Sequence, residues 1–172
     1  MKLSGSAATI TGVDSLVVAV AQYAIYVVAA GALLVWLLLP RTDKVGLAVQ
    51  AVVTVVLVAV LVKVAGAVHT DPRPFVVDPT LKPLFAHPAD NGFPSDHTAL
   101  ASGVAILVML HRRWSGLALL VLSVAIGVCR VAAHVHHTQD ILAAVVIGVV
   151  SALGGYASWR AWESRRRVRT AA

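Results

Sequence analysis

The run LVVAVAQYAIYVVAAGALLVWLLL at residues 16–39 contains no charged side chain. A transmembrane helix needs about 20 mainly apolar residues, so this run is long enough to cross a bilayer. A second run, at residues 45–68, carries only Lys63, near its end. The first run is too long for the core of a signal peptide, and no small-residue cleavage site follows it. We therefore expect both runs to be transmembrane helices of the mature protein.

Three later runs extend this pattern towards the C-terminus. Residues 116–128 and 141–156 reach the required length with short flanking extensions, and residues 98–110 do so when the helix is counted from 96 to 114. Of the 172 residues, 59% are hydrophobic and 13% are charged, which is far from the balance of a soluble domain. The sequence therefore predicts one all-α domain, residues 1–172, built as a polytopic bundle of about five transmembrane helices.

Positive charge lies mainly on one side of this predicted bundle. With five spans the loops alternate sides, and one side collects nine basic residues and all four Trp: Arg41, Lys44, Arg112, Arg113, Arg160, Arg165, Arg166, Arg167, Arg169, Trp36, Trp114, Trp159 and Trp162. Because Lys and Arg are enriched in cytoplasmic loops and Trp at membrane interfaces, we expect this side to be cytoplasmic.

The same orientation predicts on which side of the membrane the remaining polar segments lie. Residues 160–172 form a solvated basic tail near anionic lipid, while the polar lead-in at residues 1–13 and the loops at 69–96 and 131–139 face outward. The net charge of +6 collects at a membrane face, so it favours the bilayer as a partner and not nucleic acid.

Three short polar clusters lie at the outer ends of the apolar runs. They are DPRPF at 71–75, PSDH at 94–97, and Arg130 followed by His136 and Asp140. Charge within hydrocarbon is costly, and these residues fall at helix ends instead. Since the predicted helices alternate in direction, all three clusters can meet at one membrane face. Two Arg, two His, a Ser and an Asp at one point suit phosphate chemistry.

His136 and Asp140 are four residues apart at the start of the last predicted helix, so we expect them to share a helical face. A carboxylate in that position holds one imidazole nitrogen and leaves the other free as a nucleophile or base. A plain ion pair at a helix start is the alternative. His134 and His137 flank the pair without sharing its face, so a metal site is the less favoured interpretation.

The other clusters each allow a structural and a functional interpretation. Arg130 either grips two phosphate oxygens or extends its charge to the membrane interface. Ser95 and the N–H groups after it either bind an anion, with His97 at the edge, or only cap a helix. The prolines around Arg73 either aim its side chain or merely stiffen a loop. The other ionisable loop residues show no clear pattern and are expected to be solvated: His69, Asp78, Lys82, His87 and Asp90.

In this order, the motifs Arg-Pro, Pro-Ser-x-His and Arg-x5-His-x3-Asp resemble the type 2 phosphatidic acid phosphatase superfamily. PRPF at 72–75 and FPSDHT at 93–98 are most similar to the bacitracin-resistance-type undecaprenyl pyrophosphate phosphatases. The resemblance implies an enzyme that hydrolyses undecaprenyl or another polyprenyl diphosphate to the monophosphate and inorganic phosphate. It would act at the outer face of the bacterial cytoplasmic membrane and recycle the cell-wall lipid carrier.

Two alternatives remain at this point. A different lipid phosphatase would act on phosphatidic acid, phosphatidylglycerophosphate or a polyprenyl-phosphoryl-sugar phosphate with the same residues. A small polytopic transporter or assembly protein would instead place charged side chains near the middle of the bilayer.

The resemblance also implies a role for each motif residue. His136 would attack the terminal phosphorus and form a phosphohistidine, Asp140 would orient it, and His97 would protonate the leaving lipid phosphate. No metal or other cofactor is implied. The phosphate oxygens would be held by a further group: Arg73, Ser95, Arg130 and N–H groups near Asp96, with Lys63 as an additional candidate.

Five residues depart from the superfamily pattern. Gly66 stands where the superfamily has Lys, Cys129 where it usually has Ser, His134 where it often has Gly, and Thr138-Gln139 where it has Tyr-Pro. These positions lie at the rim of the expected pocket, so they bear on the choice of substrate more than on the chemistry.

Overall fold

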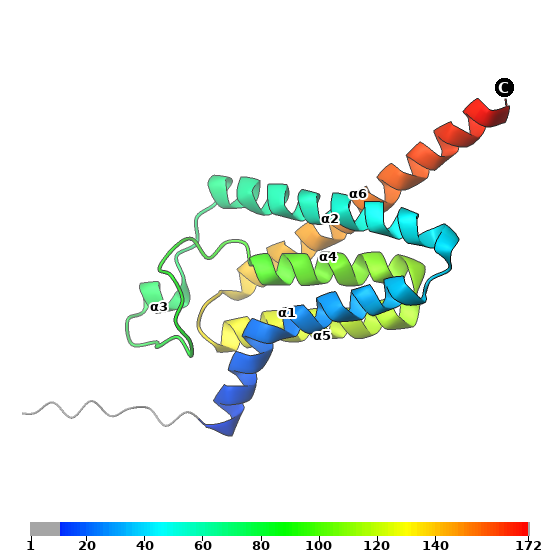
Figure 1. The fold of residues 1–172 in the computed structure, drawn as a ribbon. Helices are drawn as coiled ribbons and strands as arrows, with labels where there is room; N and C mark the ends of the chain where they lie inside the picture. Colours follow the sequence, from blue (N-terminus) through cyan, green and yellow to red (C-terminus); the bar gives the residue numbers. More distant parts are fainter. Residues whose placement is uncertain (1–10, 172) are drawn as a thin grey trace, which may run out of the picture.

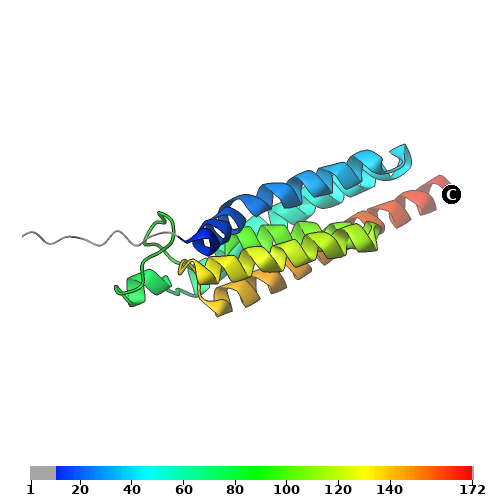
Figure 2. The ribbon, with the colours of Figure 1, turned by 90° about the horizontal axis from the view of Figure 1, so that it is seen from below.

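Helices and loops make up the computed structural model, which describes residues 11–171. In chain order the helices are α1 (Gly12–Leu38), α2 (Arg41–Val68), the four-residue α3 (Pro74–Val77), α4 (Asp96–His111), α5 (Arg113–Ala132) and α6 (Thr138–Ala171). The five long helices lie side by side in alternating directions (Figure 1 and Figure 2). The predicted all-α bundle is confirmed, while residues 1–10 of the expected lead-in lie outside the described part of the chain.

Helices α1, α2 and α5 agree with the predicted spans, whereas α4 is shorter than predicted and α6 continues well beyond its predicted span. Within residues 11–171, four helices are long and apolar enough to cross a membrane: α1, α2, α5 and α6. α4 has 16 residues and ends at His111, so the prediction of a helix over 96–114 was wrong in length. The backbone turns at Arg112, and α5 starts at the next residue. Gly116 permits this tight turn, because a Cβ there would collide with the backbone of Met109.

α4 occupies the centre of the bundle and packs against α1, α2, α5 and α6. Small residues bring α4 and α6 close together. A Cβ on Gly148 of α6 would collide with Ser102 and Gly103 of α4. Close approach through small residues is a common basis of helix packing in membranes, where burial of apolar surface gives little driving force. The start of α4 is therefore held firmly at one end of the bundle.

The two ends of the bundle differ in structure. The loops at residues 69–95 and 133–137 and helix α3 lie together at one end, on the left in Figure 1. The other end holds the short turns between α1 and α2 and between α4 and α5. The expected solvated tail from residue 160 is a helical continuation of α6, which projects beyond the bundle at this second end.

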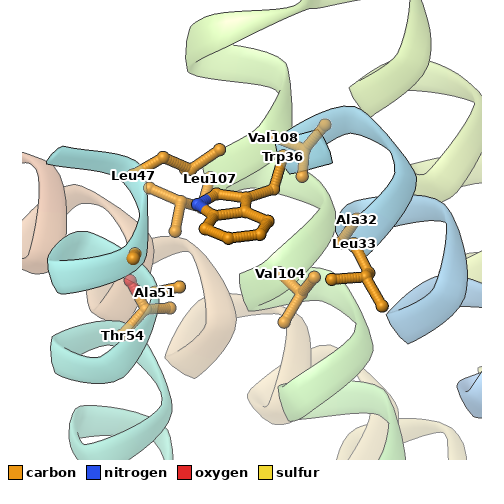
Figure 3. A pocket seen from close by; sticks show the side chains of 10 residues that line it. Ala32, Leu33, Trp36, Leu47, Ala51, Thr54, Val104, Leu107 and Val108 are labelled. Atoms are coloured by element: carbon orange, nitrogen blue, oxygen red, sulfur yellow. The ribbon is translucent and has the colours of Figure 1, made fainter. Parts of the chain in front are cut away.

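An apolar cavity of about 320 Å³ lies between α1, α2 and α4, near the second end. Figure 3 shows Trp36 of α1 over Leu107 and Val104 of α4, with Ala51 of α2 on the facing wall. The Trp36 indole N–H donates a hydrogen bond to the Lys44 carbonyl at 2.9 Å. This cavity is separate from the polar loops, which hold the motif residues predicted from the sequence.

Candidate functional site

The three polar clusters meet at the loop end of the bundle. Arg73 Nη1 lies 3.4 Å from His136 Nε2, which joins the first cluster to the third. The backbone N–H of Ser95 donates to the Asp140 carbonyl at 3.3 Å, which joins the second cluster to the third. The predicted convergence of the motifs at one end of the bundle is thus observed.

Asn91 ties the long loop to the end of α2. Its side-chain oxygen accepts hydrogen bonds from the backbone N–H groups of Asp71 at 2.9 Å and Phe93 at 3.0 Å. Its amide group donates to the carbonyls of Gly66 at 3.0 Å and His69 at 3.1 Å. Four hydrogen bonds from one side chain hold the DPRPF segment beside the FPSDH segment. Sequence reasoning missed Asn91, although the dipeptide Asn-Gly is a turn signal.

Two glycines allow the loop backbone to approach the site. A Cβ on Gly92 would lie 3.3 Å from Asp140 Oδ2 and 3.4 Å from the Arg73 side chain. A Cβ on Gly66 would lie 3.0 Å from the Phe93 carbonyl. The close approach of Phe93 gives a physical reason for Gly66 where the superfamily has Lys.

His136 and Asp140 form a buried pair. The distance from His136 Nδ1 to Asp140 Oδ2 is 3.2 Å, and Oδ2 also accepts the backbone N–H of His137 at 2.8 Å. The expectation that both residues lie on one helix was wrong, because α6 begins at Thr138. Asp140 sits in the first turn and caps the helix, and the same oxygen orients His136. This leaves Nε2 of His136 free to face Arg73.

The surroundings of His136 keep its ring neutral. Burial lowers its pKa, and the nearby charges of Arg130 and Arg73 lower it further, although the hydrogen bond to Asp140 acts in the opposite direction. A neutral ring with Nδ1–H held by a carboxylate carries its lone pair on Nε2. His136 is therefore placed as a nucleophile or a base.

Arg73 lies directly before α3 and is buried, with Pro74 as the first helical residue. Its Nη1 donates to the Val135 carbonyl at 2.7 Å, and its Nε donates to Asp90 Oδ1 at 2.9 Å. These contacts aim the guanidinium at His136. The prolines around Arg73 therefore do more than stiffen a loop, because the Arg73 side chain beside them is held in a fixed direction.

Arg130, in the last turn of α5, is only 3% exposed. Its Nη1 donates to the Ala21 carbonyl of α1 at 3.2 Å, and its Nη2 donates to His87 Nε2 at 3.2 Å. Its Nε is buried and has no hydrogen-bond partner within the described residues. A side chain that reached out to the membrane interface would be exposed, so that interpretation is wrong for Arg130.

Ser95 and His97 lie at the start of α4. Ser95 is fully buried, and its Oγ accepts the backbone N–H of Thr98 at 3.5 Å, so its capping role is observed. Oγ also shares a hydrogen bond with Thr98 Oγ1 at 3.1 Å. The first N–H groups of a helix have no intrahelical partner and attract anions. The N–H groups of Asp96 and His97 belong to this first turn.

The side chains of Lys63 and Asp96 are not drawn into the cluster. Both are exposed, and both border a mainly apolar groove between α2 and α4 that also includes Val62 and Leu100. Within residues 11–171, neither side chain makes a hydrogen bond to the residues around His136. Their predicted part in phosphate binding stays a prediction.

Two loop residues that were expected to be solvated instead contact the predicted arginines. His87 accepts from Arg130, and its ring centroid lies 6.3 Å from that of His136. Asp90 accepts from Arg73. No local sequence pattern marks either residue, because their contacts depend on how the whole loop folds. The side chain of Asp78, by contrast, is exposed and hydrogen-bonds the nearby Thr80, as expected of a surface turn.

The remaining histidines of this region point to different partners. His134 Nδ1 hydrogen-bonds the Lys82 carbonyl at 3.1 Å, and His137 Nε2 hydrogen-bonds the Pro72 carbonyl at 3.1 Å. Across the described part of the chain, no three His, Cys, Asp or Glu side chains gather closely enough to share a metal ion. Independence from metals stays a prediction about the reaction.

Residues 45–164, which contain every motif residue from Arg73 to Asp140, match the model of the PAP2 superfamily. The chain belongs to this superfamily. It is 38% identical over 134 residues to the bacitracin transport permease protein BcrC of Bacillus licheniformis, a match that covers 77% of this chain and 65% of that relative. It is 31% identical over 137 residues to the undecaprenyl-diphosphatase BcrC of Bacillus subtilis, covering 80% and 70%. The chain thus spans about two thirds of the length of these relatives.

Among solved structures, the chain is similar to the crystal structure of Aquifex aeolicus LpxE, with a TM-score of 0.69. The identity is 24%, and the match covers 86% of this chain and 87% of the other. This similarity shows that the chain has the same helical fold as that protein. The resemblance predicted from the three motifs is confirmed, both for the superfamily and for its bacitracin-resistance-type members.

Proposed function

We propose that this PAP2 superfamily member is a membrane phosphatase that hydrolyses a polyprenyl diphosphate, with undecaprenyl diphosphate as the first candidate substrate. The observation that carries the proposal is the buried His136–Asp140 pair, whose free Nε2 lies 3.4 Å from a guanidinium nitrogen of Arg73. The similarity to the undecaprenyl-diphosphatase BcrC of Bacillus subtilis supports the choice of substrate.

The first proposed step forms a covalent intermediate. Nε2 of His136 attacks the terminal phosphorus, and the bond from that phosphorus to the bridging oxygen breaks. His97 is protonated once the anionic diphosphate is bound, because the nearby negative charge favours the imidazolium, and it gives this proton to the departing lipid monophosphate. In the second step, His97 takes a proton from water, the resulting hydroxide attacks phosphorus, and the bond to His136 breaks. Inorganic phosphate leaves, and both histidines return to their starting protonation states.

The charge on the transferred group is proposed to be met by fixed donors. Arg73 and Arg130 would hold the oxygens of the phosphoryl group, and Nε of Arg130 is a buried donor free for this purpose. The N–H groups of the first turn of α4 add further donors, and Ser95 keeps that turn capped. Once the phosphate is bound, these donors are held in place by the fold, so little reorganisation is needed during the reaction itself.

We propose that the loop end of the bundle faces outward from the bacterial cytoplasmic membrane. Three cation–π pairs at the opposite end support this orientation, because Lys and Arg are enriched on the cytoplasmic side and Trp marks a membrane interface: Lys44 with Trp36, Arg113 with Trp114, and Arg166 with Trp162. The test is cysteine labelling in intact cells after Cys129→Ser. Ala89→Cys should react with a membrane-impermeant reagent and Ser115→Cys should not. The reverse pattern would place the reaction in the cytoplasm.

The substrate test uses purified protein and a panel of prenyl diphosphates, phosphatidic acid and phosphatidylglycerophosphate. We expect phosphate release to be fastest from the prenyl diphosphates and to survive EDTA. Preference for a phospholipid phosphate would assign the site to another lipid phosphatase. Loss of activity with EDTA and rescue by a divalent ion would instead indicate a metal site near His134 and His137.

The role of His97 is tested separately with His97→Ala. General acid help is worth roughly 10²- to 10⁴-fold, so the first step should slow by that factor. A substrate with a better leaving group needs less protonation and should recover part of the single-turnover rate. If His97→Ala lowers the single-turnover rate by the same factor with both substrates, His97 has a role other than acid catalysis.

A further inference from the structure

Both arginines of the site already carry acceptors from one loop. Asp90 Oδ1 lies 2.9 Å from Arg73 Nε, and His87 Nε2 lies 3.2 Å from Arg130 Nη2. Asp90 and His87 are three residues apart in the chain, so one short segment reaches both guanidinium groups. In each case the acceptor occupies a donor that a phosphate oxygen would otherwise take.

Both acceptors are chemically able to take the place of a phosphate oxygen. A carboxylate presents an oxygen to a guanidinium much as a phosphate does. His87 Nδ1 lies 3.4 Å from the Pro88 carbonyl, so Nδ1 carries the proton and Nε2 offers its lone pair to Arg130. Burial and the neighbouring charge of Arg73 lower the pKa of His87, which favours this neutral form.

The segment is also placed so that a ligand can displace it. The Asp90 side chain is 61% exposed although its partner Arg73 is 6% exposed. His87 is half-buried, and the centroid of its ring lies 6.3 Å from the centroid of the His136 ring. Ion pairs with one exposed partner are weak, so a phosphate with more charge can compete for the arginine.

We propose that Asp90 and His87 are internal ligands of Arg73 and Arg130 which an entering phosphate displaces, so that this loop sets the affinity of the site for phosphate. The inference rests on the proposed function only in taking the cluster as a phosphate site. It gives two loop residues a role that the proposed function does not include. They compete with the substrate phosphate for the two arginines.

The test is calorimetric titration of the full chain, in detergent micelles, with inorganic phosphate. Asp90→Ala should lower the Kd by about 1.5- to 5-fold, because phosphate no longer displaces an ion pair. Asp78→Ala is the matched control, since it removes the same charge from the same loop without touching an arginine. The control should leave the Kd within experimental error of the wild-type value.

His87→Asn should lower the Kd by about two- to tenfold, because the shorter side chain no longer holds Arg130. His134→Asn is its control, and Asn tolerates the positive φ of 61° at that position. A higher Kd for Asp90→Ala or His87→Asn would mean that the loop positions the arginines or binds the phosphate itself, which overturns the inference. An unchanged Kd, or equal shifts in the controls, overturns it as well.

Two further measurements keep the result unambiguous. Thermal unfolding monitored by circular dichroism checks that each variant folds, and Asp90→Asn, which preserves the shape of the side chain, replaces Asp90→Ala if needed. Turnover of prenyl diphosphate is measured in parallel on the wild-type chain. Absent turnover with the expected Kd pattern would refute the proposed reaction alone, whereas normal turnover with unchanged Kd values would refute the loop inference alone.

Discussion

The two ends of the bundle hold their positive charges in opposite ways. At the loop end, Arg73 and Arg130 are buried, and each donates to a backbone carbonyl and to a loop side chain. At the other end, Arg113 and Arg166 are exposed and lie over Trp rings at 5.1 and 5.3 Å. Fixed, desolvated charge binds a specific anion strongly, whereas exposed charge is screened by water and salt. The comparison predicts that equivalent substitutions will have large effects at one end and small effects at the other.

The largest effect is expected at His136. His136→Ala removes the proposed nucleophile, so turnover of prenyl diphosphate should fall to the background rate. His111→Ala is the control at the opposite end, where His111 hydrogen-bonds Gln50 at 2.9 Å. Phosphate release from both variants is measured under saturating substrate. Substantial turnover by His136→Ala would contradict a mechanism with a covalent intermediate on His136.

A somewhat smaller loss is expected for Asp140→Asn. Without the carboxylate, His136 is no longer held in the required tautomer, so kcat/KM should fall by about 10²- to 10⁴-fold. Asp140 raises the pKa of His136, so its removal should lower that pKa further. Activity needs neutral His136 and is lost as pH falls through this pKa. The acid limb of the pH profile should therefore move to lower pH in the variant, and a move to higher pH would contradict the assignment.

Next in size is the replacement of a buried guanidinium by an ammonium group. Arg73→Lys loses the contact with the Val135 carbonyl that positions the guanidinium, and a Lys cannot grip two oxygens in the same plane. We expect kcat/KM to fall by about 10²- to 10³-fold, comparable to the loss of one preorganised donor. Arg113→Lys makes the same change at the opposite end and should stay close to wild type. Similar losses of kcat/KM in Arg73→Lys and Arg113→Lys would contradict the proposed difference between the two ends of the bundle.

The smallest effect is expected for Arg166→Ala. An exposed cation–π contact contributes about 0.5–1 kcal/mol, and it lies far from the loops that carry the site. Turnover should stay within about twofold of wild type. A flotation assay should detect the protein in the membrane fraction at normal levels. A large loss of turnover with normal membrane insertion would show that the basic end takes part in catalysis.

Much of the fold could be predicted because long apolar runs constrain a chain strongly in a bilayer. The run at 45–68 became the greater part of α2, and the run at 16–39 lies almost wholly within α1. The length of α4 could not be predicted in the same way. Its end depends on the turn at Arg112 and on the contact of Gly116 with Met109, which are features of the packed structure.

The candidate site divides along similar lines. His136, Asp140, Arg73 and Arg130 were predictable because their spacing relative to helix ends brings them to one face. His87, like the loop residues Asp90 and Asn91, could not be predicted, because the contacts that tie each of them to the site or to α2 join residues 17 or more positions apart in sequence. Such contacts are set by the path of the loop and leave no periodic signal.

The central claim, that His136 is the nucleophile of a phosphate site, is tested most directly by trapping the intermediate. Purified protein is mixed with prenyl diphosphate labelled in the terminal phosphate, quenched under alkaline conditions that preserve phosphohistidine, and digested for mass spectrometry. We predict that the label lies on the peptide containing His136 and is absent from His136→Ala. Label on His97 instead, or label that persists in His136→Ala, would contradict the assignment.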